Sequence, residues 1–412
     1  MEQPEHCCRA CPICGGSHLD SLLYLPKIPA FVNVLSDTLE EAKSLPQGTQ
    51  SLVQCEHCGF VFNRTYEASK VMYDTGYHAE RCHSDYYTQH IRHVVDLIES
   101  ISPLKGQTVL EVACGDGEFL AEVAKRGPEI AVGVDPSAPE CKGNLFHLEK
   151  TLFDEAYLKR MSGPVDIIIN RHMVEHILNP LDMLKHFRRA LSADGILYLE
   201  TPRLDWILEN QAFFDFPYEH CAYYSDSFMV RLLNMAGFEI TAMEHSYDGQ
   251  YFSICARKCA VPASFVPVAE EELLHVRQRF SKLTCTYKNT NQEKIIQCFC
   301  TETLRSSEPD LNSRSIHTLE GLYLWGAAAK GIMCANLLDK WPIVGFIDRN
   351  TYKQGKFVPG AGHRVLAPSQ ISYKFVKTVI VENDVYFSEI WNEVQKIDPR
   401  ISVVLLSKLL GK

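Results

Sequence analysis

A strand, a glycine-containing turn and a helix follow one another between residues 108 and 126, and this unit most constrains the fold. Residues 108–113 form an apolar run typical of a buried strand, Cys114-Gly-Asp-Gly117 forms the turn, and the next apolar residues have helical spacing. A second apolar run, residues 130–134, ends at Asp135. Two strands joined by a crossover helix predict a parallel sheet covered by helices.

The residues around this turn indicate which ligand it holds. Asp135, 20 residues after Gly115, is placed to accept hydrogen bonds from both hydroxyls of a ribose. A dinucleotide loop needs a third glycine where this chain has Leu120, and the acids Glu111 and Asp116 would repel a pyrophosphate. The same acids suit the cationic sulfonium and ammonium groups of S-adenosylmethionine. The sequence therefore predicts that cofactor, disfavours a nicotinamide oxidoreductase, and leaves open a packed turn without a ligand.

The predicted cofactor site extends to later strands of the same sheet. Residues 165–169 and 195–200 form two further strands, and ligands of such sheets lie at the carboxyl ends of the strands. Two apolar residues after residue 151 are candidates to flank the adenine. The predicted cofactor-binding residues are Glu111, Ala113, Gly115, Gly117, Asp135, Leu152, Phe153, Asn170 and His172. Glu175 and His176 follow the strand that ends near residue 169, and the sequence leaves them open between packing and function.

Two cysteine pairs near the N-terminus predict a metal site. Cys11 and Cys14 form one CxxC pair, Cys55 and Cys58 form the other, and each pair is followed by glycine. Glycine permits the tight turn that brings backbone N–H groups toward thiolate sulfurs. Four thiolates suit a closed, tetrahedral and structural zinc site without a catalytic role. The alternative is two unrelated pairs of buried or redox thiols.

The loop at residues 216–225 is the predicted substrate side. It contains Tyr218, Glu219 and His220 in succession, and we predict that His220 is a general base oriented by Glu219, with Tyr218 contacting the substrate. Tyr77, in a stretch rich in tyrosine and histidine, is a candidate to close over the site. The alternative is that these side chains pack the edge of the sheet.

The amino-acid composition limits the kinds of binding partner that we expect. The net charge of -10, from 51 acids and 41 bases, argues against a nucleic-acid binder. No apolar run approaches the roughly 20 residues of a membrane span, and no secretion signal is visible. We therefore expect a cytoplasmic protein in a reducing compartment, a monomer or small homo-oligomer, with a small-molecule substrate.

The C-terminal part carries two motifs that identify a family resemblance. Tyr323-Leu-Trp-Gly326-Ala-Ala-Ala-Lys330-Gly331 resembles the YGAxAKG turn, and the run from Asp348 to Gly360 resembles the DxNxxKQGxxxPG motif, of the nucleotide-sugar C-methyltransferase family. The turn is a strand-to-helix connection able to approach a phosphate, with the charge of Lys330 beside it. With the cysteine pairs and the cofactor turn, the resemblance covers nearly the whole chain.

The resemblance implies an α/β architecture in which a Rossmann-like class I methyltransferase domain lies between a zinc-binding domain and a C-terminal Rossmann-like domain. The expected limits are residues 1–65 for the zinc-binding domain, 66–258 for the methyltransferase domain with its helical lead-in, 259–320 for a helical linker and 321–412 for the C-terminal domain. It implies C-methylation of a nucleotide-linked keto-deoxysugar, whose nucleotide Lys330, Gly331 and Asp348 would help to hold.

The family's Y-D-E-H motif is only half present. Glu219 and His220 match it, but Pro217 and Tyr218 stand at the tyrosine and aspartate positions. The acceptor atom is therefore open, and the alternatives are O- or N-methylation of a sugar or another small metabolite, or a non-catalytic nucleotide-binding scaffold.

Overall fold

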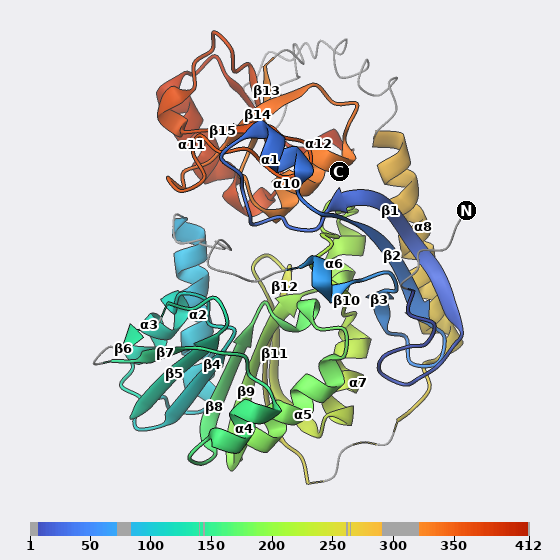
Figure 1. Cartoon of the computed structure of the whole chain (residues 1–412), viewed down its shortest axis with the longest axis vertical. Coiled ribbons are helices and arrows are strands. Elements are labelled where there is room, and N and C mark those ends of the chain that lie inside the picture. The colour runs from blue at the N-terminus through green and yellow to red at the C-terminus, as the bar shows by residue number, and fades with distance from the viewer. Residues whose placement is uncertain are drawn as a thin grey trace.

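The computed structural model describes residues 7–71, 84–139, 141–142, 145–260, 263, 265–290 and 321–410. These residues form three sheets with their helices: a C-terminal unit, a methyltransferase-like unit, and an N-terminal sheet beside them (Figure 1). The predicted three-part α/β architecture is confirmed.

The first sheet is antiparallel and combines segments far apart in the sequence. Its strands, in spatial order, are β1 (Leu19–Pro29), β2 (Gln47–Cys55), β3 (Val61–Asn63) and β10 (Ala222–Tyr223). Ala222 pairs with Phe62, so a strand from the middle of the chain completes the N-terminal sheet. The helical turns of this part are α1 (Leu39–Ser44) and η1 (Ala68–Lys70).

The second sheet has the order β11-β12-β9-β8-β4-β5-β7-β6. Its strands are β4 (Thr108–Val112), β5 (Ile130–Asp135), β6 (Cys141–Lys142), β7 (His147–Lys150), β8 (Val165–Arg171), β9 (Leu191–Pro202), β11 (Phe238–Ser246) and β12 (Tyr251–Lys258). The strands from β9 to β7 run parallel, and β12 lies antiparallel between β9 and β11. This arrangement is the class I methyltransferase sheet.

The helices of this unit follow from their caps and apolar faces. They are α2 (Asp85–Ile101), α3 (Glu118–Ala124), α4 (Glu155–Arg160), η2 (Val174–His176), α5 (Pro180–Ala190), α6 (Leu204–Glu209) and α7 (Asp226–Met235). Helix α5 begins with Asn179 as its cap and Pro180 in its first turn. Between these helices, Ile167 and Ile168 of β8 are fully buried, as expected for a parallel strand covered on both faces.

The third sheet is wholly parallel, with the order β15-β14-β13-β16-β17. Its elements are β13 (Leu322–Trp325), α10 (Ala329–Leu337), β14 (Ile343–Ile347), β15 (Arg364–Leu366), η3 (Pro368–Gln370), β16 (Thr378–Val381), η4 (Asp384–Tyr386), α11 (Phe387–Ile397), β17 (Ser402–Leu405) and α12 (Leu406–Leu409). The order reverses between β13 and β16, which is the crevice where such sheets bind ligands.

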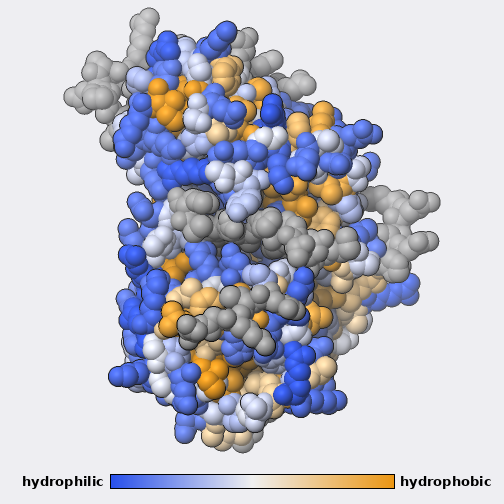
Figure 2. Space-filling view, turned by 60° about the vertical axis from the view of Figure 1, so that its left-hand side comes forward, coloured by the Kyte–Doolittle hydropathy of each residue, from blue (hydrophilic) through white to orange (hydrophobic). Residues whose placement is uncertain are grey.

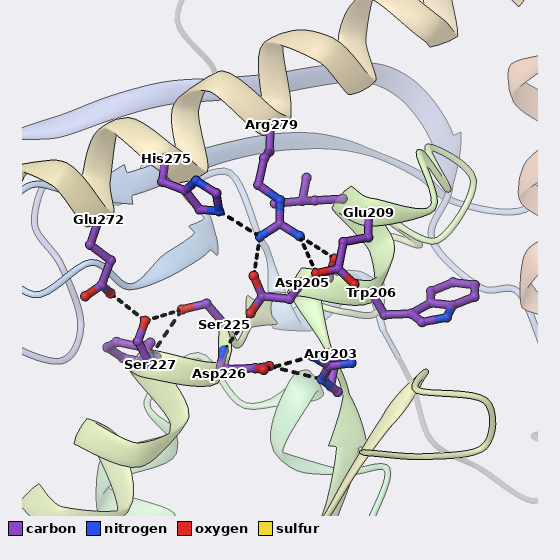
Figure 3. Close-up of polar contacts among 12 residues, drawn as sticks. Arg203, Asp205, Trp206, Glu209, Ser225, Asp226, Ser227, Glu272, His275 and Arg279 are labelled. Atoms are coloured by element: carbon purple, nitrogen blue, oxygen red, sulfur yellow. Dashed lines mark hydrogen bonds and ion pairs between the residues drawn. The ribbon is translucent and has the colours of Figure 1, made fainter. Parts of the chain in front are cut away.

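Helix α8 (Glu270–Thr290) ties the units together. Arg279 on α8 contacts the Asp205 carboxylate and donates to Glu209 Oε1 at 3.1 Å, both on α6 (Figure 3). One buried apolar cluster includes Leu25 of β1, Phe280 of α8 and Ile332 of α10. The same cluster includes Phe216 and Tyr218, so the substrate-side loop packs against the N-terminal sheet and the C-terminal unit.

On the face shown in Figure 2, hydrophilic and hydrophobic areas are mixed. Across the part of the chain that the structure describes, no helix is both long enough and apolar enough to cross a membrane.

Candidate active site

The cofactor turn has the backbone that the sequence predicts. Ala113, Gly115 and Gly117 all have positive φ, at 62°, 55° and 85°. The Gly115 N–H donates to Asp135 Oδ2 at 3.1 Å, which joins the turn to the end of the next strand. A Cβ atom on Gly117 would lie 2.9 Å from Leu148 Cδ2, so a side chain at this left-handed position would be strained and crowded.

Two acceptors at neighbouring strand ends have no hydrogen-bond partner among the described residues. They are Glu111 Oε2 on β4 and Asn170 Oδ1 on β8. Glu111 is only 2% exposed, and this burial raises the pKa of its carboxyl to about 8, although the charge of Arg171 acts to lower it. Unpartnered acceptors beside a ribose-type aspartate fit a cofactor with a cationic, N–H-donating end, as S-adenosylmethionine has.

Binding of S-adenosylmethionine should strengthen as the pH rises toward 8, where Glu111 titrates. Below that pH the carboxyl is mostly protonated, and a cation bound beside it favours its ionised form, so binding releases a proton. The dissociation constant should fall by at most about tenfold per pH unit and then level off. Calorimetry across this range measures the change. Glu111→Gln, which does not titrate, should lose the dependence, and an equal pH dependence in that variant would contradict the assignment.

A buried polar network lies next to the cofactor turn and is centred on Glu200 at the end of β9. Arg171 Nη2 donates to Glu200 Oε1 at 2.8 Å, while His90 and Tyr198 contact Oε2 at 2.8 and 3.1 Å. His172 Nε2 lies 2.9 Å from Oε1. Burial alone would raise the pKa of Glu200, but the charge of Arg171 and the histidine hydrogen bonds hold it well below its usual range. Glu200 is therefore an ionised anchor for the ends of β8 and β9.

The substrate-side loop places His220 beside Glu175 and His176. The ligand-type atoms of these three residues all lie within 4.8 Å of one another, and the two imidazole rings meet edge to face at 4.9 Å. Glu175 is buried in η2, which closely follows the β8 strand. The Glu219 carboxylate accepts the Val32 N–H at 2.7 Å, so it contacts the N-terminal part of the chain. The arrangement joins an imidazole to a buried carboxylate on the segment that follows β8.

The four predicted cysteines meet in one cluster. The Sγ atoms of Cys11, Cys14, Cys55 and Cys58 all lie within 4.8 Å of one another. Gly15 and Gly59, which follow the two pairs, have φ of 73° and 83° and donate to the carbonyls of Cys11 and Cys55 at 2.9 and 2.8 Å. Both knuckles thus have the same tight turn, and four sulfurs at this spacing can hold a metal ion.

Comparison with known proteins agrees with this geometry. A family model described as a methyltransferase domain matches residues 86–243. The C-methyltransferase NovU of Streptomyces niveus is 24% identical over 372 residues, which are 87% of this chain and 86% of that protein. Together with the strand order and the cofactor turn, these matches decide the activity. The protein is an S-adenosylmethionine-dependent methyltransferase.

Other similar proteins match the methyltransferase over a smaller part. The tRNA U34 carboxymethyltransferase of Helicobacter pylori is 30% identical over 120 residues, which are 27% of this chain and 46% of that protein. Among solved structures, magnesium protoporphyrin IX methyltransferase from Synechocystis, with bound S-adenosylmethionine, is 19% identical. That match has a TM-score of 0.32 and covers 42% of this chain and 79% of the other.

Three further predicted residues, Leu152, Phe153 and Tyr218, differ in their burial and contacts. Leu152 is 61% exposed after the end of β7, whereas Phe153 is buried against Tyr157 and Phe187. Tyr218 is fully buried, and its hydroxyl accepts the Glu67 N–H at 2.8 Å. The geometry therefore gives a substrate contact by Tyr218 no support and shows it packing the loop onto the N-terminal part.

Tyr77, the remaining predicted catalytic residue, lies outside the described residues of the methyltransferase.

The C-terminal turn has the same backbone-to-aspartate hydrogen bond as the cofactor turn. The Ala327 N–H donates to Asp348 Oδ2 at 2.8 Å, as the Gly115 N–H donates to Asp135. A Cβ on Gly331 would lie 2.3 Å from the Gly326 carbonyl oxygen, so the helix packs closely on this turn. The predicted residues of this turn are brought together at the carboxyl ends of β13 and β14.

Lys330 points from this turn toward the methyltransferase unit. Its Nζ lies 3.2 Å from Asp215 Oδ2, donates to Gln250 Oε1 at 2.6 Å, and stands 4.4 Å from the centre of the Trp206 ring. Trp206 belongs to α6 and follows Asp205, which Figure 3 shows in contact with Arg279. Lys330 therefore marks the boundary between the two Rossmann-like units.

Two buried acids that organise these sites escape the sequence patterns. In the sequence, Glu200 is recognisable only as the end of a strand, and Glu382 belongs to no motif. Glu382 nevertheless packs against the C-terminal turn. Its Oε1 lies 3.0 Å from the position of a Cβ on Gly326 and 2.9 Å from that of a Cβ on Gly331. Burial raises the pKa of Glu382 to about 8. Each acid ends or directly follows an apolar strand run, as Glu382 follows residues 378–381. An acid at the end of an apolar strand run could therefore have indicated these two residues, because such positions border the ligand crevice.

Proposed function

We propose that this methyltransferase transfers a methyl group to a carbon atom of a nucleotide-linked keto-deoxysugar. The observation that carries the proposal is the grouping of His220 with Glu175 and His176. Glu175 and His176 belong to η2, on the segment that follows strand β8 of the cofactor sheet. A carbon acid must lose a proton before it can be methylated, and an imidazole near a carboxylate is suited to take it. The similarity to a C-methyltransferase over 87% of the chain supports the same choice.

His220 is the proposed base. When bound, S-adenosylmethionine supplies the electrophilic methyl group. A keto group on the sugar acidifies the neighbouring C–H, His220 takes that proton, and the C–H electron pair becomes the nucleophile. The remaining contribution of the chain is to hold the sugar in line with the cofactor and to keep water away. Glu219 and Tyr77 remain predicted catalytic residues, and Tyr77 lies outside the described residues.

The C-terminal unit is proposed to hold the nucleotide. Asp348 lies at the corner that corresponds to the ribose-type Asp135, and Gly331 keeps the turn open to close approach. Lys330 lies at the boundary between the units, where it can reach a diphosphate that extends toward the sugar. A nucleotide held there would place its sugar toward the methyltransferase sheet.

The four-cysteine cluster is proposed to bind one structural zinc ion. Its four sulfurs leave no coordination position open, so the ion would organise the N-terminal sheet and take no part in methyl transfer. Cysteines used as metal ligands also favour a reducing, cytoplasmic setting.

The test combines binding with product analysis. Calorimetry should detect one S-adenosylmethionine per chain, and a nucleoside-diphosphate-linked 4-keto-deoxyhexose with methyl-labelled cofactor should give a product whose carbon NMR signal is that of a methyl group on carbon. A signal of a methyl group on oxygen or nitrogen would favour the second candidate, O- or N-methylation. Absence of cofactor binding would favour a scaffold instead.

A further inference from the structure

Glu175 is a buried carboxylate that lies beside the proposed base, and the proposed function assigns it no specific step. We propose that Glu175 is the positioning residue that orients His220 and stabilises its protonated form during the reaction. This inference rests on the proposed function, because it takes His220 as the base. The sequence pairs His220 with its neighbour Glu219, so the inference also names a different partner for the base.

The surroundings of Glu175 fit a carboxylate that stays ionised. Its side chain is almost completely buried, and Thr201 Oγ1 donates to Glu175 Oε2 at 2.9 Å. Burial alone would raise the pKa of Glu175, but the nearby imidazole of His172 and the charges of His176 and His220 lower it to about 2. A buried carboxylate that remains charged at neutral pH is an effective partner for an imidazolium.

The position of Glu175 is held from two sides. On one side is Thr201, which belongs to β9. On the other is His172, directly after β8, whose Nδ1 lies 3.6 Å from Glu175 Oε1 and whose Nε2 lies 2.9 Å from Glu200 Oε1. His172 has a φ of 52°, an unusual backbone for a residue other than glycine. Such strain is maintained where the surrounding contacts require it, and here it brings one imidazole between two buried carboxylates.

Glu219 is held in a different direction. Its carboxylate accepts the Val32 N–H at 2.7 Å, and its main-chain carbonyl lies 3.0 Å from His176 Nδ1. These contacts attach the loop to the N-terminal part and to η2. Glu219 therefore shapes the loop that carries His220, whereas Glu175 lies within the group of ionisable atoms that includes His220.

The pH behaviour of His220 depends on every ionisable group near it. Among the described residues, Glu175 and His176 of η2 and Tyr223 of β10 lie close to His220, Glu219 and Cys221 are its neighbours in the chain, and His172 contacts Glu175. Burial raises the pKa of Cys221 and of Tyr223, so both stay neutral in the assay range. Glu175 is then the buried negative charge whose removal should be felt most by a protonated His220.

The proton balance of the step is simple. The C–H proton of the sugar moves to His220, which becomes an imidazolium, and the electron pair remains on the substrate carbon until it forms the new bond to the methyl group. Glu175 keeps its negative charge throughout and receives no proton. Loss of that charge should make protonated His220 less stable, which lowers the pKa of the base and slows proton removal.

The decisive comparison is Glu175→Gln with Glu219→Gln, measured as kcat and kcat/KM against pH with the 4-keto sugar nucleotide. Glu175→Gln should lower kcat by about 10- to 100-fold and move the acid limb of the kcat/KM profile about one unit toward lower pH. Glu219→Gln should leave the limb in place, whatever its effect on kcat. Glu175→Asp, which restores the charge, should return the limb toward its original position.

Controls separate this role from a loss of folding. Glu244→Gln removes an exposed carboxylate that contacts His93 on the protein surface, and it should leave turnover unchanged. Calorimetry should show that Glu175→Gln still binds S-adenosylmethionine. If that variant does not fold, Thr201→Val, which deletes the hydroxyl bound to Glu175, should lower kcat about tenfold with the cofactor affinity unchanged.

Several results would overturn the inference. One is a kcat/KM profile of Glu175→Gln whose acid limb does not move, and another is an unchanged kcat in Thr201→Val. A third is an acid limb that shifts in Glu219→Gln but not in Glu175→Gln. A second divalent metal ion per chain that is lost in Glu175→Gln would show that Glu175, His176 and His220 form a metal site instead. If His220→Asn retains turnover, the proposed base itself fails, and that outcome is distinct from all of these.

Discussion

Removing the proposed zinc ion from the four-cysteine cluster is expected to unfold the N-terminal sheet and to abolish methyl transfer while cofactor binding largely survives. Structural zinc contributes roughly 10–16 kcal/mol in small zinc domains, which exceeds the stability of most domains. Cys11, Cys55 and Cys58 are themselves buried in one apolar cluster with Phe60 and Tyr224. Loss of the proposed zinc ion should therefore remove both a crosslink and the order of the core around it.

The effect should reach the substrate side because the first sheet includes β10. Ala222 pairs with Phe62, and the loop that contains His220 leads directly into this strand. If β3 loses its order, the loop loses the partner that fixes it. The cofactor turn lies in the other sheet, so its affinity for S-adenosylmethionine should change much less.

Cys55→Ser tests this expectation directly. The variant should contain about one zinc ion less per chain, melt at least about 10 °C lower and lose more than about 100-fold in turnover. Cys285→Ser, at an exposed position of α8, is the matched control and should keep all three properties. Full metal content or an unchanged melting temperature in Cys55→Ser would refute a structural metal at these cysteines.

Replacing His220 with asparagine is expected to lower turnover by about 10³-fold, because general-base catalysis typically contributes 10²- to 10⁴-fold. Asparagine keeps a polar side chain of similar size but cannot accept the proton near neutral pH. The affinity for S-adenosylmethionine should stay within about twofold, since the cofactor turn and Asp135 lie on other elements.

Single-turnover rates and calorimetry measure these two quantities separately. His93→Asn is the control, because His93 is exposed on α2 and contacts the surface carboxylate of Glu244. Turnover in His220→Asn at the unmodified rate would exclude this base and would favour transfer to an oxygen or nitrogen that needs none.

The local units of the fold were predictable. The strand before Cys114, the glycine turn and the helix after Gly117 each depend on neighbouring residues, so spacing alone indicated them. The two knuckles were equally clear, because each CxxC pair and its glycine form one turn. Their union in one cluster followed from chemistry, since four thiolates satisfy one ion.

The interior of the site was less predictable. Glu175 follows a strand and precedes His176, a pattern equally typical of packing, and its burial and contact with Thr201 arise from a residue on another strand. Tyr218 shows the converse, because its position beside Glu219 indicated a substrate contact while its hydroxyl bonds to Glu67.

The sequence by itself determined the cofactor class, the cysteine set that can hold a metal and the order of the three units, since each depends on residue types within a short stretch of chain. The tertiary structure decided that β10 completes the N-terminal sheet and that Glu175 lies beside His220. Both pairings join residues that lie far apart in the chain, from His220 to Glu175 and from Ala222 to Phe62. Which of several nearby acids meets a given histidine depends on the register and packing of separate strands, and no local spacing encodes that choice.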